Sequence, residues 1–462
     1  MTNPPNGGSP VRYAPDPASA PAAVPERRVG PGAARARRLR AAATTEPGRL
    51  RVVGAVLALL VVGFGAVTAL EVSHRASAAD DVVSRSQPLS ADAASVYRSL
   101  ADADTMAASG FLAGAQEPEA VQEQYRADIA EAARLLVKAS ATTDSSTRSR
   151  QEITTLNELL PVYTGLIERA RANNRQGLPL GGAYLRYANQ KMSDELLPAA
   201  ERLYAAETGR LGRDSAEARQ WPVLSLAAGV LVLGVLVWTQ RREYRRTNRV
   251  FNHGLLAATA AASVVLLWLA VGHGVVRAEL RSAMVHGQES LEVLNDARIN
   301  SLKARANENL TLVARGAVLT PDGAHDQYES DYATGMKALE DRLRSAGRLA
   351  DDAAGGAPVA RAVEGVAAWQ SRHRAARATD DRGDYDGALE RIIGSEDSTG
   401  QSFRQVDAAL RQALAHEQGQ FTEAAEGGRG ALRGLPTGAA ALAVLGAVAA
   451  ILGVNRRLSE YR

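Results

Sequence analysis

Residues Gln240 to Asn252 read QRREYRRTNRVFN, a short basic segment between two long apolar stretches. The segment holds five arginines and a single acid, Glu243. Short loops rich in arginine stay on the cytoplasmic side of a membrane. If the two flanking stretches cross a bilayer, this loop therefore fixes the orientation of everything on either side of it.

Four stretches are long and apolar enough to cross a bilayer, and none contains Asp, Glu, Lys or Arg. They are Val52–Leu70, Pro222–Trp238, Gly254–Val276 and Leu435–Val454. A hydrocarbon core of roughly 30 Å needs about 20 apolar residues in a helix. We place the membrane spans at residues 51–70, 221–239, 254–276 and 435–454. The alternative reading, buried helices of a soluble protein, rarely produces four such uncharged runs in one chain.

The composition excludes several classes of protein. Of the 462 residues, 46% are hydrophobic and 23% are charged, and the net charge is only +3. This balance gives no basic footprint for a nucleic acid. The chain has no cysteine, which rules out disulfides, thiolate metal sites and cysteine nucleophiles.

Residues 1–50 are rich in Pro, Gly, Ala and Arg and show no lasting apolar period, which predicts a disordered basic cytoplasmic tail. Its arginines could lie on anionic lipid headgroups, or the tail could act only as a solubilising and orienting segment. The stretch that follows is long for a cleaved secretory signal, and Glu71, His74 and Arg75 separate it from the small residues Ala76–Ala78. An uncleaved span is therefore expected.

Residues 71–220 and 277–434 each predict an extracytoplasmic four-helix bundle. Apolar residues recur at steps of three and four, as in the seam Ile153, Leu156, Leu160, Tyr163, Ile167 and Ala170. Breaks are expected at 110–118, 142–146 and 173–182 in the first region, and Pro88 is expected to kink or break its first helix. In the second region, Gly355, Gly356 and Pro358 predict a turn. The fold class is thus all-α, with four transmembrane helices and two tandem outer bundles.

The second half repeats the first. A shift of 203 residues carries 51–70 onto 254–273 and Gln124-Tyr125 onto Gln327-Tyr328, and Tyr163 corresponds to Trp369. We interpret this order of features as duplication of a span–bundle–span unit. Each unit has two spans, so the copies lie parallel in the membrane. Both termini, including the short basic tail 455–462, and the loop 240–253 are then cytoplasmic in a multi-pass protein of the plasma membrane.

Motifs for catalysis or cofactor binding are absent from the sequence. It has no phosphate-binding loop, no H-E-x-x-H and no G-x-S-x-G, and its seven histidines show no metal spacing. We therefore expect no enzyme, no cofactor and no metal. Small residues spaced by four occur in the spans, for example Gly54 with Ala58 and Gly446 with Ala450. They predict close helix packing, either in a four-helix membrane core or in a homodimer.

Two groups of residues are candidates for binding. The outer candidates are aromatic and include residues at matching places of the two bundles: Tyr125, Tyr163, Tyr184, Tyr187, Tyr328 and Trp369. They could line a ligand or partner site, or they could be core aromatics with a polar tip. The cytoplasmic candidates are the basic and aromatic residues of the central loop: Arg241, Arg242, Tyr244, Arg245, Arg246, Arg249 and Phe251. They could dock a partner, or they could serve orientation alone.

The layout and the loop R-R-E-Y-R-R-T-N-R-V-F-N resemble a known family. Each unit is similar to the outer module of bacterial chemoreceptors and sensor kinases. The tandem arrangement resembles an actinobacterial family of four-span membrane proteins. That family links an extracellular solute-binding lipoprotein for acidic amino acids and glutamine to the soluble Ser/Thr protein kinase PknG. The resemblance implies a relay between these two partners and carries over no site residue.

The functional prediction is a non-enzymatic signal relay that reports amino-acid availability across the membrane. Two alternatives remain open: a sensor that binds a small molecule directly in a bundle, and a structural or assembly protein of the cell envelope. A transporter is disfavoured because no charged or interrupted helix crosses the membrane.

Overall fold

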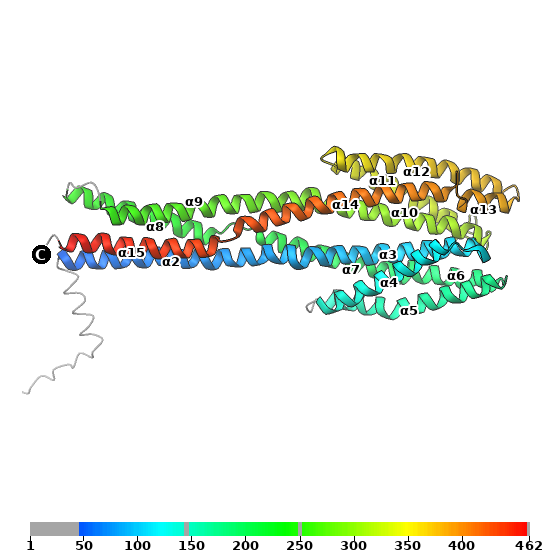
Figure 1. The fold of residues 1–462 in the computed structure, drawn as a ribbon, viewed down its shortest axis with the longest axis horizontal. Helices are drawn as coiled ribbons and strands as arrows, with labels where there is room; N and C mark the ends of the chain where they lie inside the picture. The colour runs from blue at the N-terminus through cyan, green and yellow to red at the C-terminus, as the bar shows by residue number, and fades with distance from the viewer. Residues whose placement is uncertain (1–45, 143–146, 248–251, 460–462) are drawn as a thin grey trace, which may run out of the picture.

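The computed structural model describes residues 46–142, 147–247 and 252–459, and these residues are almost entirely helical. The helices lie side by side along one long axis (Figure 1). Apart from an isolated bridge between Leu319 and Asp326, the described ranges contain no β-structure. The prediction of an all-α chain is confirmed for this part of the protein.

Four helices carry stretches long and apolar enough to cross a membrane. They are α2 (Glu46–Asp81), α8 (Val223–Thr247), α9 (His253–Ser282) and α15 (Leu435–Ser459). Helices α2 and α9 each contact both α8 and α15, so the four close into one group within a single chain. Of the two packing arrangements that the small residues allowed, the structure contains the intramolecular four-helix core.

Small side chains lie where these four helices touch. Gly65 of α2 faces Ala443 of α15, and Ala258 and Ala262 of α9 are buried. Large apolar side chains point away from the group, as Leu59 and Leu267 do with 72% and 66% of their surface exposed. This inside-out pattern is the one expected of helices surrounded by lipid, where close backbone approach drives association.

Beyond the apolar stretches, the first half of the chain forms a group that we call the first head unit, residues 87–218. It contains α3 (Gln87–Leu112), α4 (Glu119–Thr142), α5 (Thr147–Arg175), α6 (Leu180–Lys191) and α7 (Leu197–Ala218). Helix α3 packs on α4 and α7, and α5 packs on α6 and α7. All six residues of the predicted seam 153–170 are buried. The helix ends also agree with the expected breaks, because α3 ends at Leu112 and α5 at Arg175.

The second head unit covers residues 289–432. It contains α10 (Glu289–Ala314), α11 (Gln327–Leu349), α12 (Ala353–Asp380), the short α13 (Tyr385–Ile393) and α14 (Thr399–Leu432). The turn predicted at Gly355, Gly356 and Pro358 is wrong, because α12 already begins at Ala353. Asp352 caps this helix: its Oδ1 accepts from the Gly355 N–H at 2.6 Å. A strong N-cap offsets the weak helix preference of the residues that follow.

Pro88 does not break its helix. The chain runs from α2 into α3 through a π-helical turn, η1 (Val82–Ser86), and the Gln87 N–H donates to Val82 O, five residues back. A π-helical turn also precedes Pro198, where η3 (Met192–Leu196) joins α6 to α7. Widening the helix by one residue accommodates a proline that has no N–H to donate. A third π-helical turn, η4 (Ala283–Gln288), joins α9 to α10 without a proline.

The two head units pack on each other along α3 and α10, which lie at the centre of the head region (Figure 1). The two helices run in the same direction, because each continues a span helix outward. Thr105 Oγ donates to Leu302 O at 2.9 Å, and Asn309 Nδ2 donates to Ser109 Oγ at 2.7 Å. Most residues of α10 are buried, polar ones included, because it contacts helices of both units.

The contact of α2 with α15 gives a test of the membrane core. Gly65→Leu should destabilise the protein by about 1–3 kcal/mol, since the added side chain meets Ala443 in a packed interface. Gly63→Leu is the matched control: its position is exposed, with no atom within 4 Å of an added Cβ, and the change should fall within about 0.5 kcal/mol. Unfolding of the purified protein by SDS, followed by circular dichroism, measures both. Equal effects would contradict the packing described.

Candidate functional site

The basic segment is helical over its first half. Helix α8 continues to Thr247, two turns beyond the predicted end of the span. Positions 238, 241, 242 and 245 therefore share one helix face, and Trp238, Arg241, Arg242 and Arg245 line a recess of about 330 Å³. The Arg242 guanidinium lies 5.2 Å from the centre of the Trp238 ring. This arginine face can offer several guanidinium groups to an anionic surface at once.

The other cytoplasmic candidates do not line this recess. Tyr244 lies on α8 and is 47% exposed. Arg246 belongs to the same helix. Arg249 and Phe251 fall outside the described residues.

Tyr163 lies in the centre of the first head unit and is fully buried. Its hydroxyl donates to Asp104 Oδ1 at 3.1 Å, and Asn189 Nδ2 donates to Asp104 Oδ2 at 2.7 Å. Burial raises the pKa of Asp104 to about 6, although both hydrogen bonds favour the carboxylate. One buried acid thereby holds α3, α5 and α6 together through neutral partners.

Trp369 occupies a related place in the second head unit. Its Nε1–H donates to both oxygens of Glu308 at 3.1 Å. The Arg305 guanidinium and His373 Nδ1 also reach Glu308, at 2.5 and 2.9 Å. Burial opposes the charge of Glu308, but these partners hold its pKa below the ordinary value. Here the buried acid is ionised and paired, unlike Asp104.

His373 bridges two carboxylates, since its Nε2 lies 3.0 Å from Glu329 Oε1. Burial alone would lower the pKa of His373, but its hydrogen bonds to Glu308 and Glu329 raise the pKa to about 9. The ring is therefore a cation at neutral pH and donates from both nitrogens. Tyr332 stacks on it, with ring centres 3.8 Å apart. The arrangement is a charged network that ties α10, α11 and α12 together.

The remaining outer candidates do not meet in one place. Tyr125 and Tyr328 are buried, and the Arg171 guanidinium lies 4.2 Å from the centre of the Tyr125 ring. Burial raises the pKa of Tyr328 to about 12. On α6, Tyr184 is half-buried against the core, whereas Tyr187 is 51% exposed. The candidates thus divide between core positions and an exposed side chain.

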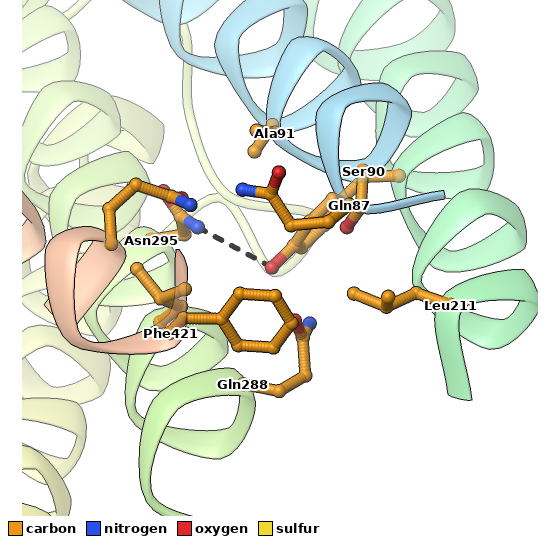
Figure 2. A pocket seen from close by; sticks show the side chains of 11 residues that line it. Gln87, Ser90, Ala91, Leu211, Gln288, Asn295 and Phe421 are labelled. Carbon is orange, nitrogen blue, oxygen red and sulfur yellow. Dashed lines mark hydrogen bonds between the residues drawn. The ribbon is translucent and has the colours of Figure 1, made fainter. Parts of the chain in front are cut away.

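A cleft between the two head units was missed by the sequence reasoning. Its wider part has a volume of about 620 Å³ and is bordered by α3, α10 and α14. A narrow part of about 20 Å³, enough for one water molecule, lies against the same helices and against Tyr204 and Leu211 of α7 (Figure 2). Figure 2 shows Asn295 and Phe421 facing Gln87 and Ser90 there, and Asn295 Nδ2 donates to the Tyr204 hydroxyl at 3.4 Å. None of the six predicted aromatic residues lines the cleft.

Next to the cleft, charged groups of both units are shared. Arg298 of α10 pairs with Asp407 of α14 at 2.6 Å and lies 3.9 Å from Asp102 of α3. Asp407 also binds Arg411 at 3.1 Å. Burial and the charge of Asp407 raise the pKa of Asp102 to about 6, and burial and the charge of Asp102 raise that of Asp128 to about 7. The boundary between the units therefore carries acids that titrate near neutrality.

One signal for this boundary was present in the sequence. Ala94, Ala101 and Ala108 recur at steps of seven on α3, and all three are buried. Another buried stripe of the same helix contains Leu89, Ala93, Val96, Leu100, Ala103 and Ala107. A helix with two buried faces must pack on two neighbours.

With this geometry established, comparison with known proteins defines the class. Residues 78–216 match the family described as the actinobacterial sensor domain, a match that covers less than a third of the chain and spans the first head unit. Neither the curated proteins nor the solved structures contain a match. Together with the four apolar helices, the match indicates a membrane protein with a sensing or signalling role.

The buried carboxyl of Asp104 predicts a specific pH dependence. Because its pKa in the folded protein is raised to about 6, the stability contributed by the protonated form is complete below about pH 4 and is lost as the pH rises through 6. In the wild type, the free energy of unfolding should fall by an amount on the order of 2–3 kcal/mol between these pH values, and in Asp104→Asn this fall should be absent. Thermal unfolding followed by tryptophan fluorescence from pH 4 to 7 measures the slope. The exposed Asp194→Asn should keep the wild-type slope, and an unchanged slope in Asp104→Asn would contradict the assignment.

Proposed function

We propose that this protein is a non-enzymatic relay across the plasma membrane. An extracytoplasmic solute-binding lipoprotein docks on the head units, and a soluble Ser/Thr protein kinase engages the cytoplasmic end. The observation that carries the proposal is the continuity of two helices: α2 runs into α3 and α9 into α10 without a loop. A contact on the head is therefore joined rigidly to the far end of the spans.

The orientation follows from charge. Arginines lie at the start of α2 (Arg49 and Arg51), at the end of α8 and at the end of α15, and these three helix ends lie at one end of the molecule (Figure 1). Under the positive-inside rule that end is cytoplasmic, with both termini and residues 240–253. The head units then lie outside.

We further propose that the two head units are four-helix bundles that arose by duplication. Supporting features recur in matching order. The π-helical turns η1 and η4 both join an incoming span to its head unit. Tyr163 and Trp369 each donate from the third helix of a unit to an acid of the first helix, Asp104 or Glu308.

Incoming and outgoing helices differ in continuity. The outgoing helices are interrupted before the spans, between α7 and α8 and between α14 and α15. The first interruption is held by α2, because Glu71 Oε2 accepts from the Ser225 N–H at 2.9 Å and Arg75 Nε donates to Gln220 O at 3.1 Å. Small shifts of a helix, about 1–2 Å, are enough to carry a signal. The unbroken helices α2 and α9 are the natural transmitters, and the interruptions absorb the movement.

A partner that binds one arrangement of the head helices better than another shifts the population toward that arrangement. The full-length protein in nanodiscs should bind a solute-binding protein for acidic amino acids or glutamine in a ligand-dependent way. Tyr187→Ala, at the exposed tyrosine of α6, should weaken this binding about tenfold. Val162→Ala, exposed on α5, is the control and should not.

Surface plasmon resonance with loaded and empty binding protein measures this interaction. Absence of binding in both ligand states would refute the relay. A deletion strain with altered cell shape and intact amino-acid responses would instead favour the structural role in the envelope.

Substitutions that conserve charge can distinguish a role of the arginine face in kinase binding from a role in setting the membrane orientation. Replacement of Arg241, Arg242 and Arg245 by Lys keeps the positive charge that sets topology but removes the planar, bidentate guanidinium groups. The triple variant should insert normally and bind the kinase at least about tenfold more weakly. Protease accessibility measures topology, and pull-down with the purified kinase measures binding. Unchanged kinase binding would mean that these arginines only orient the chain.

A further inference from the structure

Arg98 lies in the cleft between the head units and has no carboxylate partner. Its guanidinium donates to Asn295 Oδ1 and, at 2.7 Å, to Ser95 Oγ, both neutral groups. Among the described residues, no Asp or Glu oxygen lies within 4.0 Å of it. Arg98 is partly buried, and an arginine that is withdrawn from water is normally paired.

The acids around the cleft are already engaged. Asp407 is shared by Arg298 and Arg411, and Asp92 pairs with Lys138 at 2.7 Å. Burial, together with repulsion from Arg298, lowers the pKa of Arg98 to about 10. The cleft thus presents a cation that has no carboxylate in direct contact, although the more distant charge of Asp407 favours its charged form.

The rest of the lining selects the kind of anion. The apolar lining of the cleft comprises Ala91, Ala94, Leu291, Leu414 and Ala415. Its neutral polar lining includes Gln87, Gln418 and Asn295, and Asn295 accepts from the Arg98 guanidinium. A volume of about 620 Å³ is within the range of small-molecule sites. An inorganic ion would leave the apolar lining without a contact, whereas a short carbon skeleton would cover it.

We propose that the cleft between α3, α10 and α14 binds a small organic carboxylate, whose carboxylate group pairs with Arg98. The guanidinium matches a carboxylate in a bidentate geometry, and the bond is charge-assisted. The acidic side chains at the boundary stay with Arg298, Arg411 and Lys138. The ligand therefore replaces no existing ion pair.

Such a ligand touches both head units. Arg98 belongs to α3, which continues α2, whereas Leu414 and Gln418 belong to α14, which leads to α15. Occupancy would favour one spacing between these helices over others. The site provides a second input to the same spans and does not depend on a protein partner.

The test uses the purified full-length protein in nanodiscs and isothermal titration calorimetry. The probes are succinate, glutarate and glutamate; succinamide, sulfate and inorganic phosphate are the comparisons. At least one carboxylate should bind with a Kd below the millimolar range, and succinamide should not. Arg98→Gln should weaken this binding roughly ten- to hundredfold, and Arg98→Lys less. Arg344→Gln, at an exposed arginine of α11, is the matched control and should bind as the wild type does.

A second variant fills the cleft without changing charge. Ala91→Leu places a larger side chain in the lining and should also abolish binding, even if Arg98→Gln fails to fold. The proposal is overturned if no carboxylate binds, if Arg98→Gln binds as tightly as the wild type, or if sulfate and phosphate bind equally well. No partner is present in this experiment, so its failure leaves the relay to the lipoprotein and kinase untouched.

Discussion

The parallel packing of α3 on α10 is the contact on which the rest of this structure depends. It joins the two head units side by side, and each of its helices is the direct continuation of a span helix. Thr105 reaches the backbone carbonyl of Leu302 across the contact, and Asn309 reaches the hydroxyl of Ser109. Because α3 continues α2 and α10 continues α9, any sliding between α3 and α10 also displaces α2 relative to α9.

The buried polar groups of the head region fall into two sets, one inside each unit and one between the units. Inside each unit a buried acid accepts from an aromatic side chain, and these groups fix the internal packing. Between the units, Asp102, Arg298 and Asp407 share charge across α3, α10 and α14. Buried networks of this kind hold one arrangement strongly only while every member is satisfied. The boundary contains Arg98, which has no carboxylate partner, and acids that titrate near neutrality. The packing between the units is therefore less firmly fixed than the packing inside either unit.

Much of the fold could be read from periodicity. The seam from Ile153 to Ala170 is buried at every predicted position, and the apolar stretches form the four span helices. Single glycines and prolines predicted helix breaks less reliably, because neighbouring residues can keep the helix intact. A π-helical turn accommodates Pro88, and Asp352 caps a helix that contains Gly355 and Pro358. The cleft escaped prediction because Arg98, Asn295 and Arg298 look like ordinary surface residues. Their burial comes from the other half of the chain.

The sequence by itself determined the helical class, the four apolar spans and the basic ends, since each depends on residues close together in the chain. Tertiary structure alone decided which faces of α3 and α10 meet and which charges are left unpaired between them. Helix periodicity reports that a face is buried, but not by what. Only the approach of segments about 200 residues apart, such as Arg98 and Asn295, creates the cleft and sets its charge.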